Sequence, residues 1–209
     1  MEDIDIIKCY GKHLACVLLL DKSGSMAGEP IDTLNRCILQ FYVSFFKECC
    51  GAMKIADLCI ISFGGKDSDG GEPDIEVLQE FSPVPMYFKP LTANETAKET
   101  TPLAEAVETG INEIAGIKKV YRCNDIDYYK PVLICITDGE STEDEAYYNS
   151  VKDSLKEAVN NGRLSVFAFG IGDRCNYKKL SDFFGEKNTY RFEDCISRND
   201  DPIIDRFLE

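Results

Sequence analysis

The chain has 209 residues, of which 44% are hydrophobic, and its formal net charge is -14. An acidic field of this size repels phosphate backbones and anionic lipid surfaces, which argues against nucleic acid or a membrane as the main partner. The length suits a single domain with a central core.

The beginning of the chain and its cysteines indicate a compartment. Met1-Glu2-Asp3 is acidic where a secretory signal needs positive charge, and no apolar run approaches the length of a membrane span. Several of the ten cysteines, among them Cys16, Cys59 and Cys135, lie inside apolar runs typical of strands. Buried free thiols suit a reducing environment, so we expect a cytoplasmic protein.

The first predicted element is a buried strand at residues 13–20, which ends abruptly at Asp21. Asp21, Ser23 and Ser25 then follow at alternate positions, and residues two apart point the same way in extended backbone. One carboxylate and two hydroxyls that converge suit a hard cation, and Mg²⁺ fits best because it keeps several waters beside a few protein oxygens. The same residue types also form ordinary strand-to-helix turns and helix caps, so this stretch alone leaves both interpretations open.

Strands and amphipathic helices alternate along the rest of the chain. A helix is predicted from Pro30, and the apolar stripe on its inner face consists of Ile31, Leu34, Ile38, Phe41 and Phe45. Further strands are predicted at residues 56–63, 75–81, 131–137, 164–171 and 189–192. Further helices are predicted to open at Pro102 and to occupy residues 143–160, 177–184 and 202–208, with polar connections at residues 64–74 and 118–130.

This alternation predicts the fold class. Strands that are apolar on both faces and alternate with helices indicate an α/β fold with a doubly wound, mainly parallel central sheet and helices on both faces. The functional loops of such a sheet gather at the carboxyl ends of its strands. Asp21 and Asp138 each follow directly on an apolar strand. We therefore expect both carboxylates at one edge of the sheet, which supports a metal site there.

Three motifs, taken together, resemble a known family. They are Asp21-Lys22-Ser23-Gly24-Ser25, Thr101-Pro102-Leu103 and Thr137-Asp138-Gly139, each placed next to a predicted strand or helix. In this order they resemble the metal-ion-dependent adhesion site of the von Willebrand factor A (vWA) domain. The resemblance covers the whole chain as one domain, residues 1–209, with a core from about residue 13 and a lead-in at residues 1–12. Residues 21–31 most resemble the bacterial TerY-like group, which is linked to tellurium resistance and chemical stress.

The resemblance implies a set of ligands and a function. Ser23, Ser25 and, in some states, Thr101 are implied to bind the ion through their hydroxyls, while Asp21 and Asp138 act largely through bound waters. The implied ion is Mg²⁺, with Mn²⁺ or Ca²⁺ as alternatives. The implied function is a non-enzymatic module whose ion accepts an Asp or Glu carboxylate from a partner protein. The TerY-like group adds stress-response assemblies that include a kinase and a phosphatase.

Several residues near the motifs need an assignment. The middle ligand is open between Thr100 and Thr101; alignment on the following Pro-Leu pair favours Thr101 and leaves Thr100 as a helix cap. Lys22 is expected to be a solvated surface lysine, Glu140 a loop carboxylate, and His13 a residue that starts a strand.

Two other functions remain open. A Mg²⁺-dependent phosphoryl-transfer enzyme would use Asp21 as its nucleophile, but such enzymes need a second acid two residues later, where this chain has Ser23. A metal-free vWA scaffold is the other alternative. The complete set of five oxygen-bearing residues argues against it.

Overall fold

The computed structural model describes residues 12–36, 38, 56–65, 75–83, 89–93 and 100–192. Its strands are β1 (Leu14–Asp21), β2 (Ala56–Phe63), β3 (Ile75–Ser82), β4 (Val132–Thr137), β5 (Ser165–Gly170) and β6 (Thr189–Arg191). Its named helices are α2 (Leu103–Cys123), α3 (Glu145–Asn160) and α4 (Tyr177–Phe184), with short 3-10 turns at η1 (Gly24–Met26) and η3 (Glu186–Asn188). Residues 29–36 are also helical.

The strands form one sheet in the order β3-β2-β1-β4-β5-β6. Neighbouring strands are parallel except for the pair β2 and β3, which is antiparallel. The predicted α/β fold with a doubly wound, mainly parallel sheet is confirmed. β1 and β4 lie side by side in the middle of this sheet, so the loops that follow them are neighbours.

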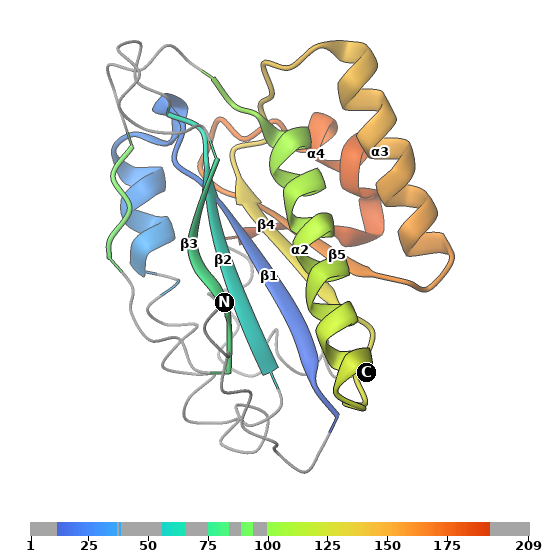
Figure 1. Ribbon diagram of the computed structural model, residues 1–209. Helices are drawn as coiled ribbons and strands as arrows, with labels where there is room; N and C mark the ends of the chain where they lie inside the picture. Colours follow the sequence, from blue (N-terminus) through green and yellow to red (C-terminus); the bar gives the residue numbers. More distant parts are fainter. Residues whose placement is uncertain are drawn as a thin grey trace.

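Helices cover both faces of the sheet (Figure 1). Successive residues of β1 alternate between the two layers, since Val17 and Leu19 pack with α2, α3 and α4 while Leu18 and Leu20 pack with Ile31 and its helix. This alternation is the reason why the strand is apolar throughout, as expected for a central parallel strand. The core therefore fixes β1 from both sides before its last residue, Asp21, reaches the edge of the sheet.

The helix α2 is longer than the sequence analysis predicts. Residues 118–123 were expected to belong to a polar connection, but they continue the helix to Cys123. Ile114, Ile117 and Tyr121 are buried at spacings of three and four, so the apolar face of the helix extends past the two lysines at positions 118 and 119. Tyr121 is buried in the last part of α2. A sequence pattern does not reveal this burial, because the polar hydroxyl of tyrosine makes the residue look compatible with solvent.

The other predicted elements agree within two or three residues. The helices at residues 143–160 and 177–184 correspond to α3 and α4, and the edge strand at residues 189–192 corresponds to β6. Phe41, Phe45, most of the connection at residues 64–74 and the helix at residues 202–208 lie outside the described residues.

A buried polar cluster ties the carboxyl-terminal part of α2 to the sheet. His13 forms a bridge just before β1, as predicted, and its Nδ1 lies 2.7 Å from Oδ2 of Asp57 at the beginning of β2. The hydroxyl of Tyr121 donates a hydrogen bond to the same carboxylate oxygen. All three side chains are buried. Since α2 begins at the opposite edge of the sheet, this cluster fixes the position of the helix along the strands (Figure 1).

The cluster yields a prediction about stability. Tyr121→Phe removes the hydrogen bond to Asp57 and leaves a buried carboxylate with one donor fewer, so we expect the free energy of unfolding to fall by about 1 to 3 kcal/mol. Urea unfolding measures this change. Tyr129→Phe is the matched control, because Tyr129 is among the exposed aromatic residues and should lose almost nothing. Equal stability of the two variants would mean that the cluster does not anchor α2.

Candidate metal centre

The first loop of the candidate site follows β1 directly. Asp21 is fully buried, and its Oδ1 accepts a hydrogen bond of 2.8 Å from the backbone N–H of Ser23. The short turn η1 then returns the chain, so that the hydroxyl oxygens of Ser23 and Ser25 lie 3.0 Å apart. Ser23 is buried while Ser25 is exposed. The two hydroxyls lie together as the alternate spacing predicts, while the convergence of Asp21 with them on one ion stays a prediction.

A glycine from another loop packs tightly against Ser23. Gly64, just after β2, has a positive φ of 83°, and a Cβ added to it would lie 2.9 Å from the Cβ of Ser23. No side chain fits there without moving Ser23, and φ itself favours glycine. The contact between Gly64 and Ser23 cannot be predicted from a local sequence pattern, because the two residues are far apart in the chain.

The loop after β4 meets the first loop through Thr137. The hydroxyl of Thr137 donates a hydrogen bond of 2.6 Å to Oδ2 of Asp21, and it accepts one of 3.1 Å from the N–H of Gly139. Asp138, the next residue, is buried, and its Oδ1 accepts a hydrogen bond of 3.2 Å from the N–H of Glu140. Asp21 and Asp138 thus lie at the same edge of the sheet, as predicted. Thr137 belongs to a motif quoted above but was given no role.

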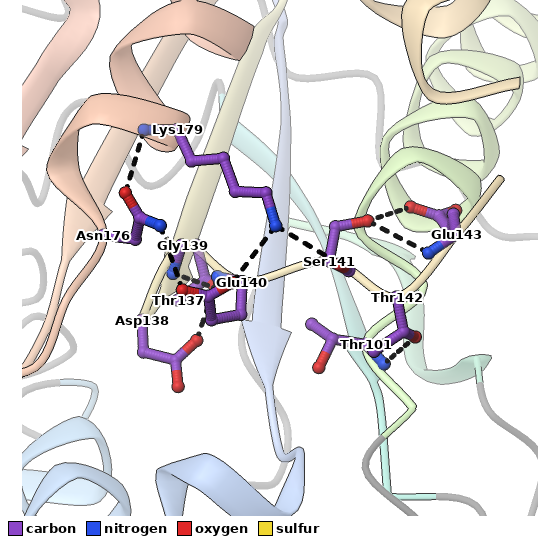
Figure 2. A network of polar contacts seen from close by, with 10 residues as sticks. All are labelled: Thr101, Thr137, Asp138, Gly139, Glu140, Ser141, Thr142, Glu143, Asn176 and Lys179. Atoms are coloured by element: carbon purple, nitrogen blue, oxygen red, sulfur yellow. Dashed lines mark hydrogen bonds and ion pairs between the residues drawn. The ribbon is translucent and has the colours of Figure 1, made fainter. Parts of the chain in front are cut away.

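Thr101 lies just before α2 and is buried. Its backbone N–H donates to the hydroxyl of Thr142 at 2.9 Å, and its carbonyl accepts from the N–H of Thr142 at 3.3 Å. Figure 2 shows that the side chains of Thr101 and Asp138 face the same side of these loops. All five predicted site residues therefore belong to three loops at one edge of the sheet.

Thr100 does not cap α2, contrary to the prediction. The N–H groups of Ala104 and Glu105, in the first turn of the helix, are bound instead by the carboxylate of Glu143 from the loop after β4. The carbonyl of Thr100 accepts a hydrogen bond of 3.4 Å from Gly65, which turns the residue toward β2. The cap comes from a residue 39 positions away from Ala104, so no local pattern reveals it.

The prediction for Lys22 is also wrong, because its side chain is buried and not solvated. Its backbone N–H donates to the carbonyl of Phe63, which continues the β1–β2 ladder by one residue. Its ammonium lies 3.7 Å from the carboxylate of Glu76 on β3. The aliphatic part of a lysine can be buried in this way while the charged end reaches a partner. Glu140, by contrast, is an exposed loop carboxylate as predicted, bound by Asn176 and Lys179.

The electrostatics of the site are dominated by two buried acids. Burial and, second to it, the negative charge of Asp138 raise the pKa of Asp21 to about 7, although the hydrogen bonds from Thr137 and Ser23 act in the opposite direction. Two neighbouring carboxylates in a buried position without a cation are costly when both are ionised. A bound cation at this place would offset that cost.

The oxygens fit a hard divalent ion. The donors are carboxylates and hydroxyls only, and within the described part of the chain no group of three or more His, Cys, Asp or Glu side chains could hold a metal. Such a set disfavours zinc and suits Mg²⁺, Mn²⁺ or Ca²⁺. Two neighbouring oxygens in an octahedral Mg²⁺ site, each about 2.1 Å from the ion, are about 3.0 Å apart. The two serine hydroxyls already have this separation.

Comparisons with known proteins agree with the fold. The family model of the von Willebrand factor type A domain matches residues 16–201 of the sequence, so the chain belongs to this family. Among solved structures, the chain is similar to the pilus adhesin SpaC from Lactobacillus rhamnosus GG, with a TM-score of 0.58, 14% identity, and coverage of 87% of this chain and 28% of that chain. The manganese-loaded TRAP protein of Plasmodium vivax has a TM-score of 0.52 and 15% identity, with coverage of 92% and 66%. The proximal thread matrix protein 1 of the mussel byssus has a TM-score of 0.51 and 15% identity, with coverage of 86% and 44%.

These similarities concern the fold, because the identities are low. The chain spans less than two thirds of the length of each of the three solved chains. A comparison with curated proteins finds no match. In the part of the chain that the structure describes, no helix has the length and apolar character needed to span a membrane.

The buried acids predict an unusual response to Asp21→Asn in the metal-free protein. Because the pKa of Asp21 is raised on folding, the folded state holds its proton more tightly than the unfolded state, and ionisation of Asp21 lowers stability as pH rises toward 7. Asparagine keeps the shape and the acceptor for Ser23 but carries no charge. We therefore expect Tm in the presence of a chelator to rise by a few degrees at neutral pH, and the gain to shrink in acid.

Thermal unfolding followed by circular dichroism measures this effect. Asp182→Asn is the control, because Asp182 is an exposed acid whose pKa is lowered mainly by its hydrogen bond from Lys152. It should not gain stability. A fall in Tm for Asp21→Asn at neutral pH in chelator would show that the charge of Asp21 is not a cost to the metal-free fold.

Proposed function

We propose that this vWA domain is a non-enzymatic protein-binding module that holds a divalent cation, with Mg²⁺ as the best fit, at Asp21, Ser23, Ser25, Thr101 and Asp138. The observation that carries the proposal is the pair of buried acids, Asp21 at the end of β1 and Asp138 just after β4, which lies beside the paired hydroxyls of Ser23 and Ser25. The manganese-loaded TRAP structure, which has the same fold, supports a divalent ion. The proposed domain comprises the whole chain, with its core from about residue 13.

The chemistry of the ligands explains how such a centre binds a partner. Asp21 is held by Ser23 and Thr137 through both carboxylate oxygens, which suits a role through bound water more than direct ligation. Ser23, Ser25 and Thr101 offer neutral hydroxyls, which leave most of the charge of the ion uncancelled. The ion supplies a strong electrophilic position for one further anionic oxygen. Ser25 is exposed, so an Asp or Glu carboxylate of a partner protein has access from solvent.

The biological setting is a narrower proposal. The sequence of residues 21–31 resembles that of the TerY-like group. We therefore propose a role in a tellurium or chemical-stress response, in an assembly that includes a kinase and a phosphatase. The strongly acidic chain matches partners that are basic overall and expose a local carboxylate, since long-range attraction then assists the encounter.

The geometry of Asp21 argues against phosphoryl transfer. A nucleophilic aspartate must expose one oxygen to the phosphorus atom. Both oxygens of Asp21 accept protein hydrogen bonds, and the residue is fully buried. A metal-free scaffold is disfavoured for another reason, because the buried pair of acids would then be a cost to folding without a function.

Calorimetric titration with Mg²⁺ and Mn²⁺ tests the proposed function. The chelator-treated wild-type protein should bind one ion, and Asp21→Ala and Asp138→Ala should each lose about a hundredfold in affinity. The fold should persist, because Asp21 is the last residue of β1 and Asp138 follows β4, so neither belongs to the hydrophobic core. Asp182→Ala removes the same charge from an exposed site on α4 and should bind like the wild type. Identical heats for the wild type and both site variants would overturn the proposal.

A further inference from the structure

The first turn of α2 is capped by a carboxylate from outside the helix. Oε2 of Glu143 accepts a hydrogen bond of 2.6 Å from the N–H of Ala104, and its Oε1 accepts one of 2.8 Å from the N–H of Glu105. The residue at the N-cap position, Pro102, has no side chain that can bind these groups. A negative charge at this place also interacts favourably with the helix dipole. The start of α2 therefore depends on the loop after β4.

The same loop holds the backbone of Thr101. Thr142, the residue before Glu143, binds both the N–H and the carbonyl of Thr101, and the carbonyl also accepts from Leu103 at 2.9 Å. The polar backbone groups of Thr101 are thus occupied by Thr142 and by the first turn of α2. Figure 2 shows the contact between Thr101 and Thr142. We infer that these two attachments fix the direction of the Thr101 side chain.

Glu143 is itself held in place. The hydroxyl of Ser141 donates a hydrogen bond of 2.9 Å to its Oε2, the same oxygen that binds Ala104. Ser141 is three residues after Asp138, in one continuous loop. Asp138 and the contacts that position Thr101 therefore belong to a single hydrogen-bonded segment, residues 138–143.

We propose that Glu143 is a positioning residue of the metal centre, which keeps the Thr101 hydroxyl in register with Asp138 by joining the first turn of α2 to the loop after β4. This inference rests on the proposed function, because it concerns the geometry of the same site. It adds a residue that does not contact the ion. Its effect on metal affinity passes through Thr101.

The test compares Glu143→Ala with a matched acid. Asp144 is adjacent in sequence, has the same charge, and caps α3 through hydrogen bonds from Ala146 and Tyr147. Both substitutions remove one charge and one helix cap, so each is expected to lower Tm by a few degrees. Glu143→Ala should also weaken Mn²⁺ binding about tenfold in calorimetric titration, as loss of an outer positioning group typically does. Asp144→Ala should change the Mn²⁺ affinity less than twofold.

Two further variants separate positioning from charge and from fold stability. Glu143→Gln keeps an oxygen that can cap α2 but has no charge, so it should recover part of the lost affinity. In the Thr101→Ala background, Glu143→Ala should cause no further loss, because there is no Thr101 hydroxyl left to position. Thermal unfolding of each variant shows that it is folded at the temperature of the titration.

The outcomes distinguish this inference from the proposed function. If the wild type binds Mn²⁺ and Glu143→Ala weakens this binding no more than Asp144→Ala does, only the positioning role is overturned. The positioning role is also overturned if Glu143→Ala lowers the Mn²⁺ affinity of the Thr101→Ala variant as much as it lowers that of the wild type, because the effect would then not pass through Thr101. Absence of Mn²⁺ binding by the wild type would overturn the proposed function, and this inference with it.

Discussion

The placement of two buried carboxylates at the adjoining ends of β1 and β4 is the constraint on which the functional edge of this protein depends. A carboxylate in a buried position needs hydrogen-bond donors, and Asp21 takes one from Ser23 in its own loop and one from Thr137 in the neighbouring strand. The bond from Thr137 joins the end of β1 to the end of β4. The surrounding fold therefore holds together two groups that repel each other when both are ionised. This repulsion lowers the stability of the fold, as is common at functional sites.

Much of this arrangement follows from local patterns in the sequence. Apolar strands that alternate with helical stripes predict the parallel sheet, and the rule that parallel strands end at one edge brings Asp21 and Asp138 together. The hydroxyls at alternate positions after β1 predict the convergence of Ser23 and Ser25, since this depends only on backbone geometry within five residues.

The features that sequence patterns did not reveal are contacts between distant segments. Glu143 caps a helix to which it does not belong, and Gly64 packs against Ser23 from another loop. Residue type alone predicts a surface position for Lys22, but the Lys22 side chain is buried and its ammonium reaches Glu76 on the antiparallel strand β3. The helix α2 continues to Tyr121, whose hydroxyl donates a hydrogen bond to the carboxylate of Asp57 on β2. In each case the decisive partner is more than 35 residues away, and residue type alone does not identify it.

The contact between Thr137 and Asp21, which joins residues 116 positions apart, has a consequence for the order of folding. β1 can collapse onto hydrophobic neighbours early, but Asp21 at its end lacks the hydrogen bond from Thr137 until β4 has docked beside β1. Closing so long a segment of chain is a late and slow event in a parallel sheet. The ion proposed for this edge would act on contacts that form only once β4 has docked, so its expected kinetic effect is mainly to slow unfolding.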